Sequence, residues 1–147
     1  MFGFGKPERT VSTAEKHFKL MIAGLAEIHG KPIPNQVFAD AYVYAFFQQL
    51  VMLSVLEVFG KAIDPVKAAA IMAAALDRIV PGYGIEIVKS ASTIANPSNS
   101  MYQHYSIGNN EGKQLTIALM NDDLVTQHEM MKSFRDYVVR NYISPDN

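Results

Sequence analysis

The sequence predicts a mainly α protein that folds as a single compact bundle-like domain of five or six helices. Apolar residues recur at spacings of three and four along most of its 147 residues, which is the periodicity of amphipathic helices. Helix-capping residues stand before these segments, and glycine or proline follows them. The length is that of one ordinary domain, to which we assign residues 12–143.

The first helix is predicted to begin at Ser12, because the sequence STAE that starts there is a capping-box pattern. From Ala14 to Ile28, apolar residues fall on one face at helical spacing. Gly30, followed by the sequence KPIP, ends the helix. We therefore expect residues 1–11 to form an N-terminal tail.

The second helix is predicted to run from a cap at Asn35 to about Phe59, with Gly60 as its stop. It is apolar on every side and contains 16 consecutive uncharged residues. These residues would span about 24 Å, which is less than the ~30 Å hydrocarbon core of a bilayer. The adjacent Gln48 and Gln49 in this run also favour a buried helix over a membrane span.

Asp64 followed by Pro65 predicts the start of the third helix. Its alanine-rich sequence, VKAAAIMAAALDRIV, favours helix and offers a wall of small side chains to the aromatic residues of the second helix. A Pro-Gly pair closes it. Residues 83–95 are predicted to form a fourth helix, which ends at the sequence NPS.

Residues 102–120 are compatible with two structures. Apolar residues and two glycines share one helical face, but GNNEG is also a turn signal and QLTIALM alternates like a strand. We favour a helix, with a short β-hairpin as the alternative; in the helix, the glycines would allow close packing. The last helix is predicted to follow a cap at Asp122 or Asp123, and residues 144–147 to form a C-terminal tail.

Composition argues against several functional classes. The net charge is −1 without any basic run, whereas nucleic-acid binding needs a basic face. The absence of cysteine excludes disulfides and thiolate chemistry and is compatible with a cytoplasmic protein. The four histidines show no metal-ligand spacing, so we expect neither a metal nor another cofactor.

We expect a small soluble, non-enzymatic protein that acts by protein–protein interaction or self-association. Hydrophobic residues make up 49% of the chain, and charged residues only 18%. A domain of this size is not expected to surround the helix of residues 38–59 on every side, which would leave an apolar face for a homodimer or a protein partner. The predicted contact residues are Tyr42, Phe46, Phe47 and Phe59.

The alternative is a small-molecule binding protein or enzyme with an interhelical pocket around His128, Arg135 and Tyr105. His128 and Arg135 are seven residues apart and lie near the apolar stripe of the last helix. His104 lies beside Tyr105 on the preceding segment, and together these groups would bind an anionic or polar ligand. The competing interpretation is an interior ion pair in which Glu57 neutralises Arg135.

Overall fold

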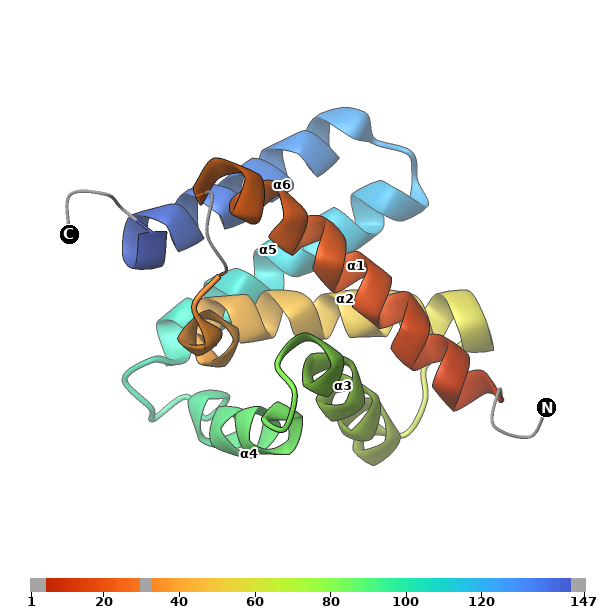
Figure 1. The fold of residues 1–147 in the computed structure, drawn as a ribbon. Helices are drawn as coiled ribbons and strands as arrows, with labels where there is room; N and C mark the ends of the chain where they lie inside the picture. The colour runs from red at the N-terminus through yellow and green to blue at the C-terminus, as the bar shows by residue number, and fades with distance from the viewer. Residues whose placement is uncertain (1–4, 30–32, 144–147) are drawn as a thin grey trace.

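The structure is a computed structural model that describes residues 5–29 and 33–143 (Figure 1). Within these residues it contains six α-helices, two short helical turns and no strand, which confirms the predicted mainly α, bundle-like domain. The elements are α1 (Lys6–His29), the 3-10 turn η2 (Asn35–Ala39), α2 (Ala41–Phe59), α3 (Pro65–Ile79), α4 (Gly84–Ile94), α5 (Tyr102–Met120), α6 (Leu124–Val138) and the π-helical turn η3 (Val139–Ile143). The C-terminal tail predicted at 144–147 lies outside the described residues.

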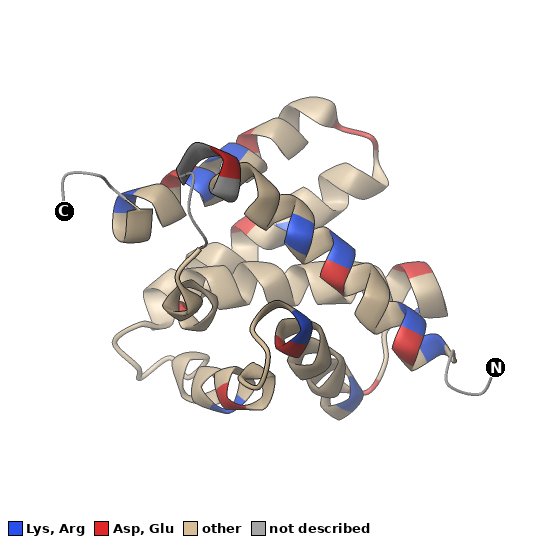
Figure 2. Ribbon diagram, viewed as in Figure 1, with Lys and Arg blue, Asp and Glu red and all other residues tan. Residues whose placement is uncertain are grey.

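The arrangement places α2 in the middle of the molecule. In Figure 1, α1 crosses α2, while α3 and α4 lie on one side and α5 and α6 on the other. Twelve of the nineteen residues of α2 are buried. This helix is long and apolar enough to cross a membrane, but 61% of its most apolar window is buried inside the fold, as in the core helix of a soluble protein. Figure 2 shows the charged residues mainly on the outer helices, with α2 almost free of them.

The first helix begins at Lys6, so it starts six residues before the predicted Ser12. Pro7 stands in its first turn, where the missing N–H costs no hydrogen bond. The hydroxyl groups of Thr10 and Thr13 donate to carbonyl groups four residues earlier in the helix. The capping-box pattern is therefore helix interior, and the predicted tail is helical from Lys6 onward.

Asp40, rather than Asn35, caps the central helix. Its Oδ1 accepts hydrogen bonds from the backbone N–H groups of Tyr42 at 2.8 Å and Val43 at 3.1 Å. The predicted continuous helix is therefore divided into η2 and α2. The predicted stop at Gly60 is confirmed, because this glycine adopts φ of 76°, a left-handed conformation.

The other carboxylate oxygen of Asp40 binds residues of α6 and η3. Its Oδ2 accepts hydrogen bonds from the hydroxyl of Tyr137, at 2.9 Å, and from that of Tyr142. Burial raises the pKa of both tyrosines, and the hydrogen bonds to Asp40 raise them further, so both hydroxyls remain donors at neutral pH. One side chain thus fixes the start of α2 and the end of α6.

An aromatic cluster fills the space between α1, α2 and α6. The rings of Phe18 and Phe47 stack at 4.4 Å, and those of Phe46 and Phe134 meet at 4.8 Å. Such pairs contribute about 0.5–1.5 kcal/mol each beyond their burial. Ala68 and Ala69 of α3 line a small cavity of about 190 Å³ together with Tyr44 of α2.

Two glycines of α5 set its distance from α2. A Cβ atom at Gly108 would lie 2.1 Å from the carbonyl oxygen of Tyr42, and one at Gly112 would lie 2.9 Å from that of Phe46. No other side chain fits at this approach without moving backbone. The segment is a continuous helix, so the hairpin alternative is wrong and the glycines serve close packing.

The paired glutamines of α2 also face α5. Gln49 donates from Nε2 to Asn109 Oδ1 at 2.5 Å, and Tyr105 donates from its hydroxyl to Gln48 Oε1 at 2.7 Å. The polar groups in the middle of the apolar segment are therefore satisfied between two helices of the same chain.

Gly108→Ala should lower the free energy of unfolding by about 3 kcal/mol or more, because the new methyl group meets the backbone of α2. Gly24→Ala is the matched control, since a Cβ at Gly24 in α1 would meet nothing within 4 Å. It should leave stability unchanged or raise it by up to about 1 kcal/mol. Urea unfolding measures both, and equal effects would contradict the close packing.

Asp40→Ala should destabilise the protein by about 3 kcal/mol, because it removes a helix cap and leaves two half-buried tyrosine hydroxyls without their acceptor. Asp64→Ala is the comparison, since Asp64 caps α3 through a single exposed bond to Val66 N. This change should cost about 1 kcal/mol. Thermal unfolding of both variants measures the difference, and the prediction fails if Asp40→Ala costs no more than Asp64→Ala.

Candidate functional site

Most of the predicted interface residues lie in the core. Tyr42, Phe46 and Phe47 are 2%, 0% and 1% exposed, because neighbouring helices cover the first half of α2 on all sides. These three residues are not available to a partner, which corrects the predicted interface. Phe59, at the C-terminal end of α2, is half-buried and borders a surface groove.

The residues of the predicted interhelical pocket do not come together. His128 and Arg135 line a shallow depression of about 300 Å³ on α6, together with Glu129, Met131 and Lys132. This depression is lined by α6 alone. His128 and Arg135 share one face of α6, as their seven-residue spacing implies, but His128 is exposed and the predicted interhelical pocket does not form around them.

Tyr105, His104 and Glu57 lie elsewhere. Tyr105 donates to Gln48 of α2, and burial raises the pKa of its hydroxyl. His104 lines a separate cavity between α5 and α6. Glu57 accepts a hydrogen bond from His17 of α1 at 2.9 Å, so it is not the partner of Arg135.

The groove beside Phe59 is a mainly apolar surface recess that includes a predicted residue. It has a volume of about 390 Å³ and lies between α1, the end of α2 and α3. Its lining residues are Pro7, Glu8, Val11, Phe59, Ile63, Lys67, Ala70, Ile71 and Ala74. Seven of these nine are apolar, and the two charged ones carry opposite signs.

The helical register of α3 produces this groove. Lys67, Ala70, Ile71 and Ala74 stand at positions i, i+3, i+4 and i+7, so they share one face of the helix. Ile71 is 5% exposed and forms the floor, whereas the two alanines are exposed. Because the alanines are short, the face stays hollow instead of being filled by its own side chains. Val11 of α1 closes the floor.

Charged side chains at the edge of the groove connect α1 to α3 and to Phe59. Lys6 Nζ lies 5.7 Å from the centre of the Phe59 ring, in a cation–π arrangement. Arg78 of α3 binds Glu8, and it also binds Glu15 and Ser12 of α1 at 3.1 Å each. These bonds fix the N-terminal half of α1 against α3. The pKa of Glu15 is lowered, mainly by the hydrogen bond from Lys19 and to a smaller extent by the one from Arg78. The pKa of Arg78 is raised, mainly by its hydrogen bond to Glu15.

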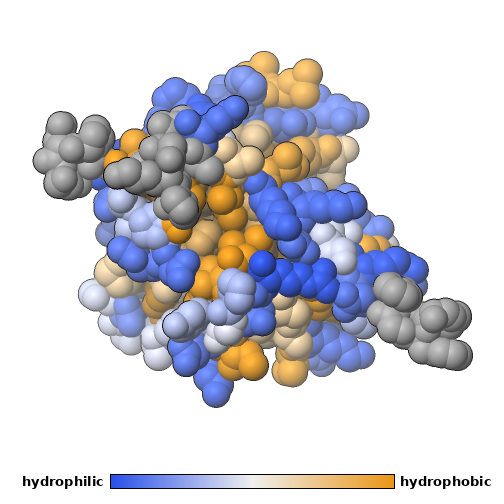
Figure 3. All heavy atoms as spheres, viewed as in Figure 1, coloured by the Kyte–Doolittle hydropathy of each residue, from blue (hydrophilic) through white to orange (hydrophobic). Residues whose placement is uncertain are grey.

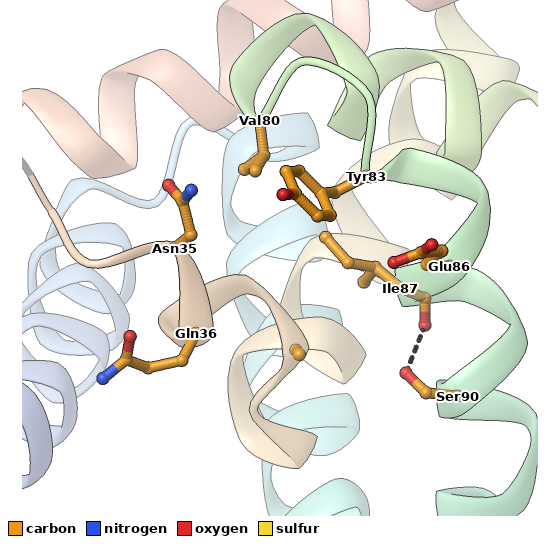
Figure 4. Close-up of a pocket in the computed structure, with 8 residues that line it drawn as sticks. Asn35, Gln36, Val80, Tyr83, Glu86, Ile87 and Ser90 are labelled. Carbon is orange, nitrogen blue, oxygen red and sulfur yellow. Dashed lines mark hydrogen bonds between the residues drawn. The ribbon is translucent and has the colours of Figure 1, made fainter.

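A second hollow lies on the face shown in Figure 3, where hydrophobic spheres gather near the centre. It has a volume of about 440 Å³ and lies between η2 and the start of α4. Its lining residues are Asn35, Gln36, Ala39, Val80, Tyr83, Glu86, Ile87 and Ser90. Figure 4 shows the Tyr83 ring between Val80 and Ile87, across from Asn35, while Gln36 extends away from the hollow. Half of the lining residues are polar or charged, so this hollow is less apolar than the groove.

Sequence reasoning missed the groove because it assigned the alanines of α3 to the core. The available signal was the helical phase: Ala70 and Ala74 are offset by one residue from the buried Ile71 and Ala75, so they lie on a neighbouring, exposed part of the helix surface. A helix with small residues on its outer face leaves room beside any helix that packs next to it.

Comparisons with known proteins give no assignment for this site. No protein-family model matches the chain, and no match was found among curated proteins or solved structures. Among the described residues, no group of three or more histidine, aspartate or glutamate side chains is placed to hold a metal ion. The functional argument therefore depends on the shape and chemistry of the surface.

Arg78→Gln should loosen the start of α1 without unfolding the domain. Exposed ion pairs contribute little to global stability, so the free energy of unfolding should fall by less than about 1 kcal/mol. Amide hydrogen exchange of the first turns of α1 should nevertheless become faster, because Glu8 and Glu15 lose their tie to α3.

The control is Lys132→Gln, which removes an exposed pair with Asp136 within α6. It should leave exchange in α1 unchanged. Unchanged exchange in α1 of the Arg78 variant would show that this network does not position the groove.

Proposed function

We propose that the protein acts without catalysis, by binding an apolar segment of another polypeptide in the groove between α1 and α3. The observation that carries this proposal is the apolar lining of the groove, in which exposed Ala70 and Ala74 sit above the buried floor of Ile71 and Val11. Grooves of this kind bind the apolar face of an amphipathic helix.

The shape of the groove supports a helical partner segment. Short alanine side chains allow the backbone of a partner to approach α3 closely, as small residues do at helix–helix contacts. Phe59, the last residue of α2, and Ile63, which follows α2, both line the groove and offer apolar surface to an inserted side chain. An apolar centre with a charged edge is the usual anatomy of an interface.

The charged residues at the edge of the groove indicate which charges the polar face of the partner should carry. Glu8 and Lys67 carry opposite charges among the groove residues, and Lys6 lies over Phe59. A partner with both acidic and basic residues beside its apolar stripe would complement them. A second copy of this chain is the alternative occupant, which would make the protein a homodimer. We place its action in the cytoplasm, where a chain without cysteine suits a reducing environment.

A photo-reactive phenylalanine analogue at position 74 should cross-link the protein to a discrete polypeptide in its native cells. Position 74 lies in the groove, and position 23, an exposed alanine of α1, serves as the matched control outside it. We expect the adduct from position 74 alone, and we expect Ala70→Arg to abolish it because a long charged side chain fills the groove.

The mass of the adduct identifies the occupant. A mass of two copies of this chain, together with concentration-dependent light scattering, indicates self-association; any other discrete mass indicates a different partner. The proposal is wrong if position 74 gives no discrete adduct, or if positions 74 and 23 give the same products.

A further inference from the structure

A polar cavity of about 360 Å³ lies between α5 and α6, beside the start of α2. It shares no lining residue with the groove between α1 and α3. Glu111 and His104 come from one face of α5, seven residues apart, and Ser133, Tyr137 and Arg140 come from the facing side of α6 and η3. Facing side chains on neighbouring helices are a common way to build a small-molecule site.

Glu111 forms the acidic end of the cavity. Its Oε1 accepts hydrogen bonds from the hydroxyl of Tyr42 at 2.5 Å and from that of Ser133 at 2.7 Å. Burial, and then the hydrogen bond to Glu111, raises the pKa of Tyr42, so its hydroxyl stays a donor. Both bonds use the same oxygen. Oε2 makes no hydrogen bond to a described residue, and no buried polar side-chain atom in the described part of the chain lacks a partner, so Oε2 is accessible to solvent on a residue that lines the cavity.

The basic end lies about two helical turns away. His104 and Glu111 are seven residues apart on α5, which corresponds to about 10 Å along the helix axis. The His104 ring lies 6.4 Å from the ring of Tyr137, and the Arg140 guanidinium lies 5.9 Å from the same ring. The hydroxyl of Tyr137 donates to Asp40, and its ring stacks on that of Tyr42 at 4.1 Å, so the ring is held close to the two basic groups.

The remaining acid of the cavity is already paired. Asp136 accepts a hydrogen bond from Lys132 at 2.6 Å within α6, so its charge is offset. Glu111 is therefore the acid that a ligand cation would meet, and Arg140 the permanent cation that a ligand anion would meet.

We propose that this cavity binds a small zwitterion, whose primary ammonium group binds Glu111 Oε2 and whose carboxylate binds Arg140 and His104. The separation of the two ends selects a molecule with several carbon atoms between its charges. The ring of Tyr137 supplies the apolar surface on which this spacer lies.

The charges of the cavity disfavour other ligand classes. A phosphate or other multiply charged anion would meet the uncompensated charge of Glu111. An entirely apolar ligand would strip water from Glu111 and Arg140 without replacing their hydrogen bonds.

The test compares three probes: ε-aminocaproate, which carries both charges, caproate, which carries the carboxylate alone, and hexylamine, which carries the ammonium alone. Binding is followed by NMR chemical shifts of the backbone amides in the full chain. We expect saturable shifts around residues 104, 111 and 137, and at least about tenfold tighter binding of ε-aminocaproate than of either single-charge probe.

Two substitutions assign the charges. Glu111→Gln retains a carbonyl oxygen that accepts from Tyr42 and Ser133, so the fold should survive, and Arg140→Gln changes an exposed side chain. Each should weaken the binding of ε-aminocaproate at least about tenfold. Lys113→Gln, an exposed change on α5 outside the cavity, should leave it unchanged.

The proposal is overturned if none of the three probes shifts the cavity amides at millimolar concentration. It is also overturned if ε-aminocaproate binds no better than caproate or hexylamine, or if Glu111→Gln and Lys113→Gln have the same effect. The groove proposal is independent of these outcomes, because no cavity residue lines the groove.

Discussion

The close contact between α2 and α5 is the constraint on which the structure depends. An apolar helix can sit at the centre of a small domain only if its neighbours cover it from several directions. Gly108 and Gly112 let α5 touch the backbone of α2, at a distance that a Cβ atom would not permit. This approach also brings Asn109 and Tyr105 within hydrogen-bonding distance of the two glutamines of α2. The polar groups of the central helix are therefore satisfied inside the chain, and its aromatic residues are free to pack on α1 and α6.

The same constraint places the candidate functional surfaces at the periphery. Because the first half of α2 is used to build the core, it offers no face to a partner. The accessible recesses form where outer helices meet: the groove where α1 passes α3, and the polar cavity where α5 faces α6. Asp40 links the cavity to the core, since it caps α2 and also holds Tyr137, which lines the cavity. The two proposed sites, an apolar groove and a dipolar cavity, lie on different pairs of helices and would suit chemically different partners.

The sequence predicted those features that depend on one helical turn. Asp64 with Pro65 and Gly60 mark helix ends through local hydrogen bonds or backbone conformation, and the structure confirms both. Of the two caps predicted for the last helix, Asp122 and Asp123, the structure uses Asp123. Ser12 was misleading because a capping-box pattern has the same composition as helix interior. The partners of Glu57 and Asp40 lie 40 and 97 residues away, so no local pattern indicates them. Both candidate recesses depend on such distant pairings. Of the site residues predicted from the sequence, Phe59 lines the groove, and His104 and Tyr42 line the cavity.

The helices of this chain alone cover the first half of α2, without help from a second copy. Amide hydrogen exchange of α2, followed over a dilution series of the intact protein, tests it most directly. The amides of residues 45–51 should be among the slowest to exchange, and their rates should not change with protein concentration. Exchange in this segment that becomes faster on dilution would contradict the account, because it would show that another chain covers the central helix.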